Sequence, residues 1–182
     1  MQMAAPVYYS ADMVRTLPDD GNRYETVHGE LLVTPSPRLW HQRVAGRLYR
    51  VVDEYLERTG TGVVFFAPAD ISWSEDTLVQ PDLFVADLTE VRTLEWARVK
   101  TLLLVVEVLS PSTARSDRFT KRRLYQEVGI PAYWIVDPDR RQVEVWTPDA
   151  TLPRVEEEQV GWHPEGAAEA LVVDLEPLFR PI

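Results

Sequence analysis

The sequence contains no cysteine among its 182 residues. This excludes a disulfide framework, a thiolate zinc site and a cysteine nucleophile, so a metal ion would need carboxylate, imidazole or backbone oxygen ligands. No apolar run reaches the roughly 20 residues that a membrane span needs, and residues 1–10 lack the layout of a secretion signal. We therefore expect a cytoplasmic protein with no membrane partner.

Several common motifs are also missing. The sequence has no Walker loop, dinucleotide-binding glycine pattern, nucleophile-elbow serine or His-Glu-x-x-His motif, so we expect no nucleotide cofactor. Internal repeats and linkers rich in glycine, proline or serine are absent. These absences predict a single domain over residues 1–182 that ends in an acidic extension at 150–182.

Charge is distributed unevenly along the chain. The net charge of −10 argues against a protein that coats nucleic acid by bulk electrostatics. One window is nevertheless basic, and its five basic residues are Arg115, Arg118, Lys121, Arg122 and Arg123. This window predicts either a locally basic binding face or a solvated helix face.

The hydrophobic pattern predicts interleaved strands and helices. A short helix follows Ser10, and two strands at 24–28 and 31–34 form a hairpin that turns at Gly29. Apolar spacing predicts a long helix at 38–58, and a second helix runs from Thr113 to about Val128. Further strands are expected at 63–67, 70–73, 78–86 (interrupted by Pro81), 102–109, 132–136, 143–146 and 171–175, the last within an otherwise irregular segment. The expected fold class is α/β or α+β with a mixed sheet.

Glu107 is the sharpest anomaly, because it interrupts an apolar run of strand length, Leu102 to Leu109. That run is typical of a central strand buried on both faces. A buried carboxylate must be paired, protonated or bound to a metal. The sequence leaves open a metal ligand, an ion pair with an arginine, or a strand that emerges at the sheet edge.

Asp82 follows Pro81 at the head of another strand. Pro-Asp is a common turn dipeptide, which is one interpretation. The other interpretation pairs Asp82 with Glu107 on a neighbouring strand, where two carboxylates, a backbone carbonyl and water can hold a hard divalent cation. Such a cation activates water and neutralises a phosphate.

Lys121 is one of only two lysines in a chain that otherwise uses arginine. Asp117, Lys121 and Tyr125 lie at i, i+4 and i+8, close to one helix face. This face could lie beside the site, or Asp117 and Lys121 could form a plain surface ion pair. His41 at a helix start and Glu30 after the Gly29 turn are further candidates, although both residue types are common at such surface positions.

Several blocks of the sequence resemble the Uma-two family of restriction-endonuclease-like proteins in the PD-(D/E)XK superfamily. The resemblance covers about residues 20–147. It is carried by the following blocks: Arg23-Tyr24-Glu25, Gly29-Glu30-Leu31, Pro35-Ser36-Pro37, His41, Gln80-Pro81-Asp82-Leu83, Glu107-Val108-Leu109-Ser110-Pro111-Ser112-Thr113, Asp117, Lys121, Tyr125, Gly129-Ile130-Pro131 and Tyr133-Trp134-Ile135-Val136-Asp137-Pro138.

The resemblance implies a restriction-endonuclease-like fold, with a mixed central sheet flanked by helices and an N-terminal hairpin. It also implies a Mg²⁺ (or Mn²⁺) site made by Asp82, Glu107 and the Val108 carbonyl. The superfamily lysine position is occupied by Leu109, and the resemblance moves this lysine to Lys121. Glu30, His41 and Asp117 match positions near the site.

These implications favour a metal-dependent endonuclease that acts on DNA as a homodimer. Its phosphate contacts would come from the arginines of the basic window: Arg115, Arg118, Arg122 and Arg123. An alternative is a non-catalytic binding or regulatory protein with a vestigial site, which the acidic charge and Leu109 favour. A third is a structural pair between Glu107 and an arginine, which predicts no response to metal.

Overall fold

The apolar run before Ser110 forms the middle of a six-stranded sheet in the computed structural model, which describes residues 7–182. The strand order is β10-β9-β8-β7-β6-β3. The bounds are β3 Val63–Phe66, β6 Leu83–Ala86, β7 Leu102–Val108, β8 Tyr133–Asp137, β9 Gln142–Trp146 and β10 Arg154–Glu156. Strands β7 and β8 are parallel and the other neighbours are antiparallel, which confirms a mixed sheet.

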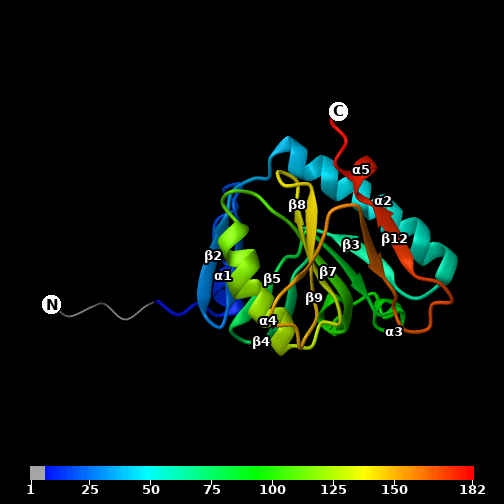
Figure 1. The fold of residues 1–182 in the computed structure, drawn as a ribbon. Coiled ribbons are helices and arrows are strands. Elements are labelled where there is room, and N and C mark those ends of the chain that lie inside the picture. The colour runs from blue at the N-terminus through cyan, green and yellow to red at the C-terminus, as the bar shows by residue number, and fades with distance from the viewer. Residues whose placement is uncertain (1–6) are drawn as a thin grey trace.

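The two faces of this sheet are covered by different elements (Figure 1). Helix α2 (Leu39–Thr59) packs against one face together with β12 (Leu171–Asp174) and α5 (Leu175–Leu178). Helix α4 (Arg122–Glu127) packs on the other face, through Leu124 and Tyr125. Because side chains alternate along β7, Val106 and Val108 face α2 whereas Val105 and Glu107 face α4.

A smaller four-stranded sheet lies beside the large one, in the order β2-β1-β5-β4. Its strands are β1 Arg23–Val27, β2 Glu30–Thr34, β4 Ile71–Ser74 and β5 Thr77–Val79. The sequence predicts one run at 78–86, but β5 belongs to the small sheet and β6 to the large one. Pro81 lacks the N–H that a continuous ladder needs, so the chain changes sheets there and places Asp82 at the junction.

The predicted helices are present. Helix α1 (Ala11–Arg15) begins at the Ser10 cap, and α2 ends at Gly60 in the left-handed conformation. The helix after Ser110 contains a π-helical segment, η2 (Ser116–Lys121), that continues into α4. Two short helices, α3 (Leu88–Val91) and η1 (Trp96–Arg98), lie in the connection between β6 and β7.

The C-terminal segment differs from the sequence prediction. We expected an irregular extension with one strand, but β10 extends the large sheet and β11 (Gln159–Trp162) forms a hairpin with β12. Val160, Trp162 and Val173 are buried in the same cluster as α2. The alternation that buries these residues is short and lies among acidic residues, which concealed it in the sequence.

None of the helices within residues 7–182 is long and apolar enough to cross a membrane. The sequence predicts no secretion signal in residues 1–10. Of these, residues 1–6 lie outside the part of the chain that the structure describes.

Candidate active site

Asp82 and Glu107 lie next to each other on neighbouring strands. Leu83 of β6 pairs with Val106 of β7, so Asp82 and Glu107 come one step further along the same ladder. The Asp82 N–H donates to Glu107 Oε2 at 3.4 Å. Asp82 is 7% exposed and Glu107 1% exposed. Since β7 lies between β6 and β8, the alternative in which Glu107 emerges at a sheet edge is wrong.

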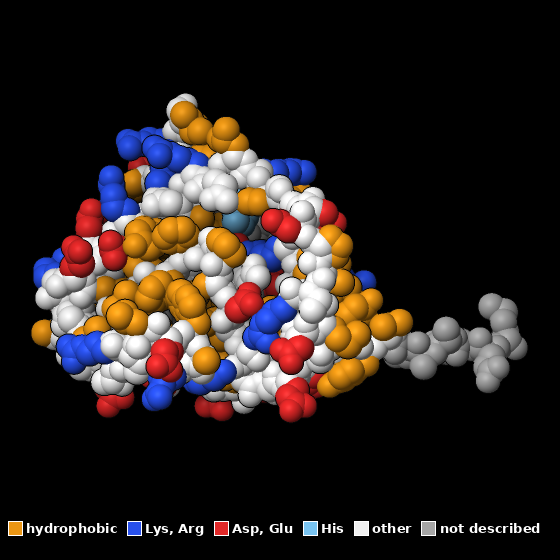
Figure 2. Space-filling view, turned by 180° about the vertical axis from the view of Figure 1, so that it is seen from behind, with side chains coloured by type: hydrophobic (Ala, Val, Ile, Leu, Met, Phe, Trp, Pro, Cys, Tyr) orange, Lys and Arg blue, Asp and Glu red, His pale blue; other side chains and the backbone are white. Residues whose placement is uncertain are grey.

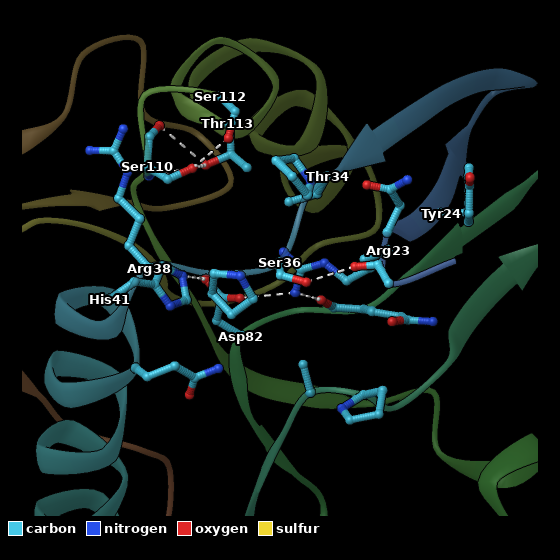
Figure 3. A pocket seen from close by; sticks show the side chains of 18 of the residues that line it. Arg23, Tyr24, Thr34, Ser36, Arg38, His41, Asp82, Ser110, Ser112 and Thr113 are labelled. Atoms are coloured by element: carbon cyan, nitrogen blue, oxygen red, sulfur yellow. Dashed lines mark hydrogen bonds and ion pairs between the residues drawn. The ribbon is translucent and has the colours of Figure 1, made fainter. Parts of the chain in front are cut away.

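The Asp82 carboxylate is held by three groups, of which Figure 3 shows the Arg23 and His41 side chains. Arg23 Nη1 donates to Oδ1 at 2.9 Å, and the Val108 N–H donates to Oδ2 at 2.8 Å. His41 Nε2 lies 2.9 Å from Oδ2. Although burial opposes ionisation, the His41 hydrogen bond and the Arg23 charge hold the pKa of Asp82 well below its usual value.

The Glu107 carboxylate is bound by the helix that follows β7. Lys121 Nζ lies 3.0 Å and the Tyr125 hydroxyl 3.1 Å from Oε1. Burial raises the pKa of Glu107 to about 8; Lys121 opposes this rise, and nearby carboxylates such as Asp82 add to it. The ion-pair partner is therefore a lysine, not the arginine that one alternative expected.

Lys121 is buried among three carboxylates. Its Nζ is 2.8 Å from Glu25 Oε2, 3.0 Å from Glu107 Oε1 and 3.7 Å from Asp117 Oδ1. Burial would lower the pKa of Lys121, but these carboxylates raise it well above its usual value. Lys121 and Asp117 are 1% and 2% exposed, so the surface-pair alternative is wrong. The π-helical segment η2 carries both residues, and such segments are frequent at functional sites.

Glu25 and Arg23 also belong to the site, although no sequence pattern predicts a role for them. They lie two apart on β1 and therefore share one face of that strand. Glu25 Oε1 accepts from the Gln80 N–H at 2.7 Å, which joins β1 to the segment that leads to Asp82. One sequence signal for these two residues was available. An acid and a base lie on one face of a short strand, in a block that resembles the Uma-two family.

Other predicted residues lie outside this cluster. Glu30 is exposed at the turn end of the hairpin, opposite to the end that carries Arg23. Arg118 pairs with Asp137 and Glu144 at 3.0 and 2.7 Å, and Arg122 stacks over the Trp146 ring. The remaining two arginines of the basic window, Arg115 and Arg123, are exposed.

A cavity of about 750 Å³ opens onto Asp82. Arg38 and His41 line it from the start of α2, Arg23 lines it from β1, and Ser112 lines it from the segment after β7 (Figure 3). The space-filling view shows a hollow in this molecule with a histidine side chain inside it (Figure 2). A substrate in the cavity can therefore reach Asp82, whereas Glu107 and Lys121 lie behind it.

The donor set fits one hard divalent cation. Four buried carboxyl groups, those of Glu25, Asp82, Glu107 and Asp117, face two cations, Arg23 and Lys121. The excess negative charge is relieved by a proton, as the raised pKa of Glu107 indicates, or by a bound cation. Among residues 7–182, no three carboxylate or imidazole groups form a ready-made metal cage. Mg²⁺ ordinarily uses only one or two carboxylates and completes its shell with water and substrate oxygens, so Asp82 and Glu107 suffice.

Comparisons with known proteins identify a family and a fold for this chain. The sequence model of the Uma2 family, described as "Putative restriction endonuclease", matches residues 11–176. The crystal structure of a putative nuclease belonging to DUF820 from Anabaena variabilis superposes with a TM-score of 0.77 at 22% sequence identity. The match covers 94% of this chain and 97% of that chain, and it shows the same fold. No curated protein matches the sequence.

Proposed function

The chain belongs to the Uma2 family, and from this premise we propose that it is a metal-dependent endonuclease that hydrolyses the phosphodiester bonds of DNA. The proposed cofactor is Mg²⁺ (or Mn²⁺). The observation that carries the proposal is a pair of buried carboxyl groups, those of Asp82 and Glu107. They lie side by side where β6 begins next to β7, within a cluster with excess negative charge. Burying that charge is costly unless a cation or a proton compensates it.

Each residue of the cluster has a proposed role. Asp82 and Glu107 would hold the cation, with the Val108 carbonyl as a further ligand. When bound, the cation supplies a Lewis acid that polarises the phosphodiester and neutralises its charge. Lys121 opposes the rise in the pKa of Glu107, and its charge would stabilise the negative charge that develops on the phosphate.

Three groups support this arrangement from around it. His41 orients Asp82 through its 2.9 Å contact, and Asp117 and Glu25 hold the Lys121 ammonium. Asp82 Oδ1 accepts one hydrogen bond, from Arg23, and Oδ2 accepts two, from His41 and Val108, so one lone pair of Oδ1 remains for a cation. Arg23 lines the cavity beside this oxygen and can contact a phosphate there.

Hydrolysis of labelled DNA tests the proposal directly. We expect cleavage with Mg²⁺ or Mn²⁺, none in EDTA, and a loss of at least about 100-fold in Asp82→Asn. Asp19→Asn is the matched control, because Asp19 lines the same cavity but is exposed and makes no ion pair with the cluster. Cleavage by Asp82→Asn at the parent rate, or cleavage without metal, contradicts the proposal.

A second candidate is a non-catalytic DNA-binding or regulatory protein on the same fold. The observation that favours it is the set of three partners around Asp82, which leaves only one of the about four lone-pair sites of the carboxylate for a cation. Leu109, at the superfamily lysine position, is buried in the apolar cluster. This candidate predicts binding of DNA with no cleavage in either metal.

The assembly proposed for the endonuclease is a homodimer, because the family resemblance suggests one and two-fold dimers are the commonest assembly of soluble oligomers. Light scattering on the purified protein measures its mass in solution and tests this proposal.

A further inference from the structure

A second, smaller cavity adjoins the first. Its volume is about 230 Å³, and it shares His41 and Asp82 with the larger cavity. Its own walls are Gly46 and Tyr49 of α2 and Phe66 of β3. We call it the aromatic cavity. A ligand that spans both cavities passes directly over the Asp82 carboxylate.

Gly46 is unusual for its place in the fold. It lies inside the 21-residue helix α2, where glycine is less favourable than alanine. A Cβ at this position would meet no atom within 4 Å, so close packing does not require a glycine. Because Gly46 has no side chain, the space beside it stays open, and Gly46 itself forms part of one wall of the aromatic cavity.

The other walls are suited to a flat ring. Tyr49 and Phe66 are arranged edge to face, with ring centroids 5.3 Å apart and planes at 90°. Phe66 is 61% exposed on an edge strand. The Gln42 carboxamide, at the junction of the two cavities, can both donate to and accept from the edge of a base.

We infer that the aromatic cavity is a nucleobase subsite, which takes a base of a single-stranded nucleic acid whose phosphodiester lies at Asp82. This inference rests on the proposed function. Bases stack on aromatic side chains in single-strand binding sites, whereas the bases of an intact duplex are stacked and paired with each other. The two cavities, joined at Asp82, therefore fit the base and the phosphate of one unpaired nucleotide.

Equilibrium binding in EDTA tests the inference without relying on hydrolysis. The ligands are fluorescent oligothymidylate of about 12 nucleotides, an abasic strand of equal length and charge, and the corresponding duplex. We expect the parent to bind oligothymidylate about tenfold or more tighter than either of the others. Gly46→Leu, which fills the cavity, should bind oligothymidylate as weakly as the abasic strand and bind the abasic strand as the parent does.

The matched control is Glu54→Leu, which places the same side chain at an exposed position of α2 outside both cavities. It should bind all three ligands like the parent, and thermal melting should show that both leucine variants are folded. Equal binding of oligothymidylate and the abasic strand by the parent, or unchanged binding by Gly46→Leu, overturns the inference.

Binding and cleavage together separate the two proposals. Base-dependent binding that is lost in Gly46→Leu, without cleavage in Mg²⁺ or Mn²⁺, supports the subsite and contradicts the nuclease function. Metal-dependent cleavage without base-dependent binding supports the function and contradicts the subsite.

Discussion

Lys121 shows how a single buried side chain can organise a site. An ammonium with three donors can serve three carboxylates that approach from different elements, and here Glu25 comes from β1, Glu107 from β7 and Asp117 from η2. A planar guanidinium directs its donors in a fixed fork and does not fit this arrangement. In a chain that has only two lysines, the choice of lysine here has a geometric reason.

Removal of this charge should be costly. Lys121→Met leaves Glu25, Glu107 and Asp117 buried without their common cation, and we expect the free energy of unfolding to fall by about 3–5 kcal/mol. Lys100→Met, at the other lysine, which is exposed, should change it by less than about 0.5 kcal/mol. Urea denaturation in EDTA measures both. Equal effects of the two substitutions would contradict the role assigned to Lys121.

The raised pKa of Glu107 predicts how stability depends on pH. The pKa is about 8 in the folded protein, compared with an ordinary value of 4.5. The folded state therefore binds the Glu107 proton more tightly than the unfolded state does. Proton binding at Glu107 contributes fully to the free energy of unfolding below about pH 4.5, and this contribution is lost as the pH rises to about 8. Burial raises the pKa of Asp117 to about 6, so a similar loss of stability from Asp117 occurs as the pH rises to about 6. The pKa of Asp82 is lowered, so its contribution stays in place throughout this range.

We therefore expect the metal-free protein to become less stable between about pH 5 and about pH 8. Glu107→Gln keeps the neutral form at every pH, so its stability should change much less over the same range. Glu54→Gln, at an exposed carboxylate, should follow the parent. Denaturation in EDTA across the range provides the test, and identical slopes for the parent and Glu107→Gln would show that Glu107 does not titrate there.

How far individual residues could be predicted depended on the kind of signal. Glu107 was identified because a carboxylate inside an apolar strand must have a partner. Glu25 is just as buried, but it lies on a strand with mixed polarity, where a charged residue attracts no attention. Its role depends on a contact with a residue 96 positions further along the chain, Lys121, which local patterns do not show.

At the level of elements, the helix after Ser110 has two different faces. Asp117, Lys121 and Tyr125 point into the site, as their spacing predicts, whereas Arg115 and Arg123 are exposed. Arg118 is held by two carboxylates of β8 and β9. The basic window is therefore neither wholly a binding face nor wholly a solvated face.

This division predicts different consequences for the arginines. Arg115→Gln and Arg123→Gln should weaken nucleic-acid binding and each reduce its salt slope by about 1, because phosphate contacts release counterions. Arg118→Gln should instead lower stability, since Asp137 and Glu144 lose their partner. Binding titrations at several salt concentrations test this, with the exposed Arg50→Gln on α2 as control. Unchanged salt slopes in both Arg115→Gln and Arg123→Gln would remove these residues from the binding surface.

Periodicity predicted the long elements well and the short ones poorly. Helix α2 and strand β7 are present as predicted, because their apolar spacing extends over many residues. The π-helical form of η2 and the strands β10 and β11 were not predicted. Strand β11 is buried in the same apolar cluster as α2, whereas β10 is mostly exposed and is held by its pairing with β9; neither partner can be recognised from the segment itself.

For the whole molecule, the sequence predicts the mixed sheet and its central strand, and it offers the pairing of Asp82 with Glu107 as one of two interpretations. The two joined cavities could not be predicted, since their walls come from α2, β3 and the segments beside β1 and β7. In the proposed site, Asp82 and Glu107 would hold one cation beside these cavities. When bound, the cation would reduce the negative charge that opposes a polyanion at Asp82.

The most direct test of this claim is thermal melting with and without Mn²⁺ or Mg²⁺ in excess. A ligand that binds only the folded state raises the melting temperature, and we expect a rise of about 5 °C or more for the parent and for Glu54→Gln. Glu107→Gln should show no rise. A parent that melts at the same temperature with and without metal, or a Glu107→Gln variant stabilised as much as the parent, would contradict the account.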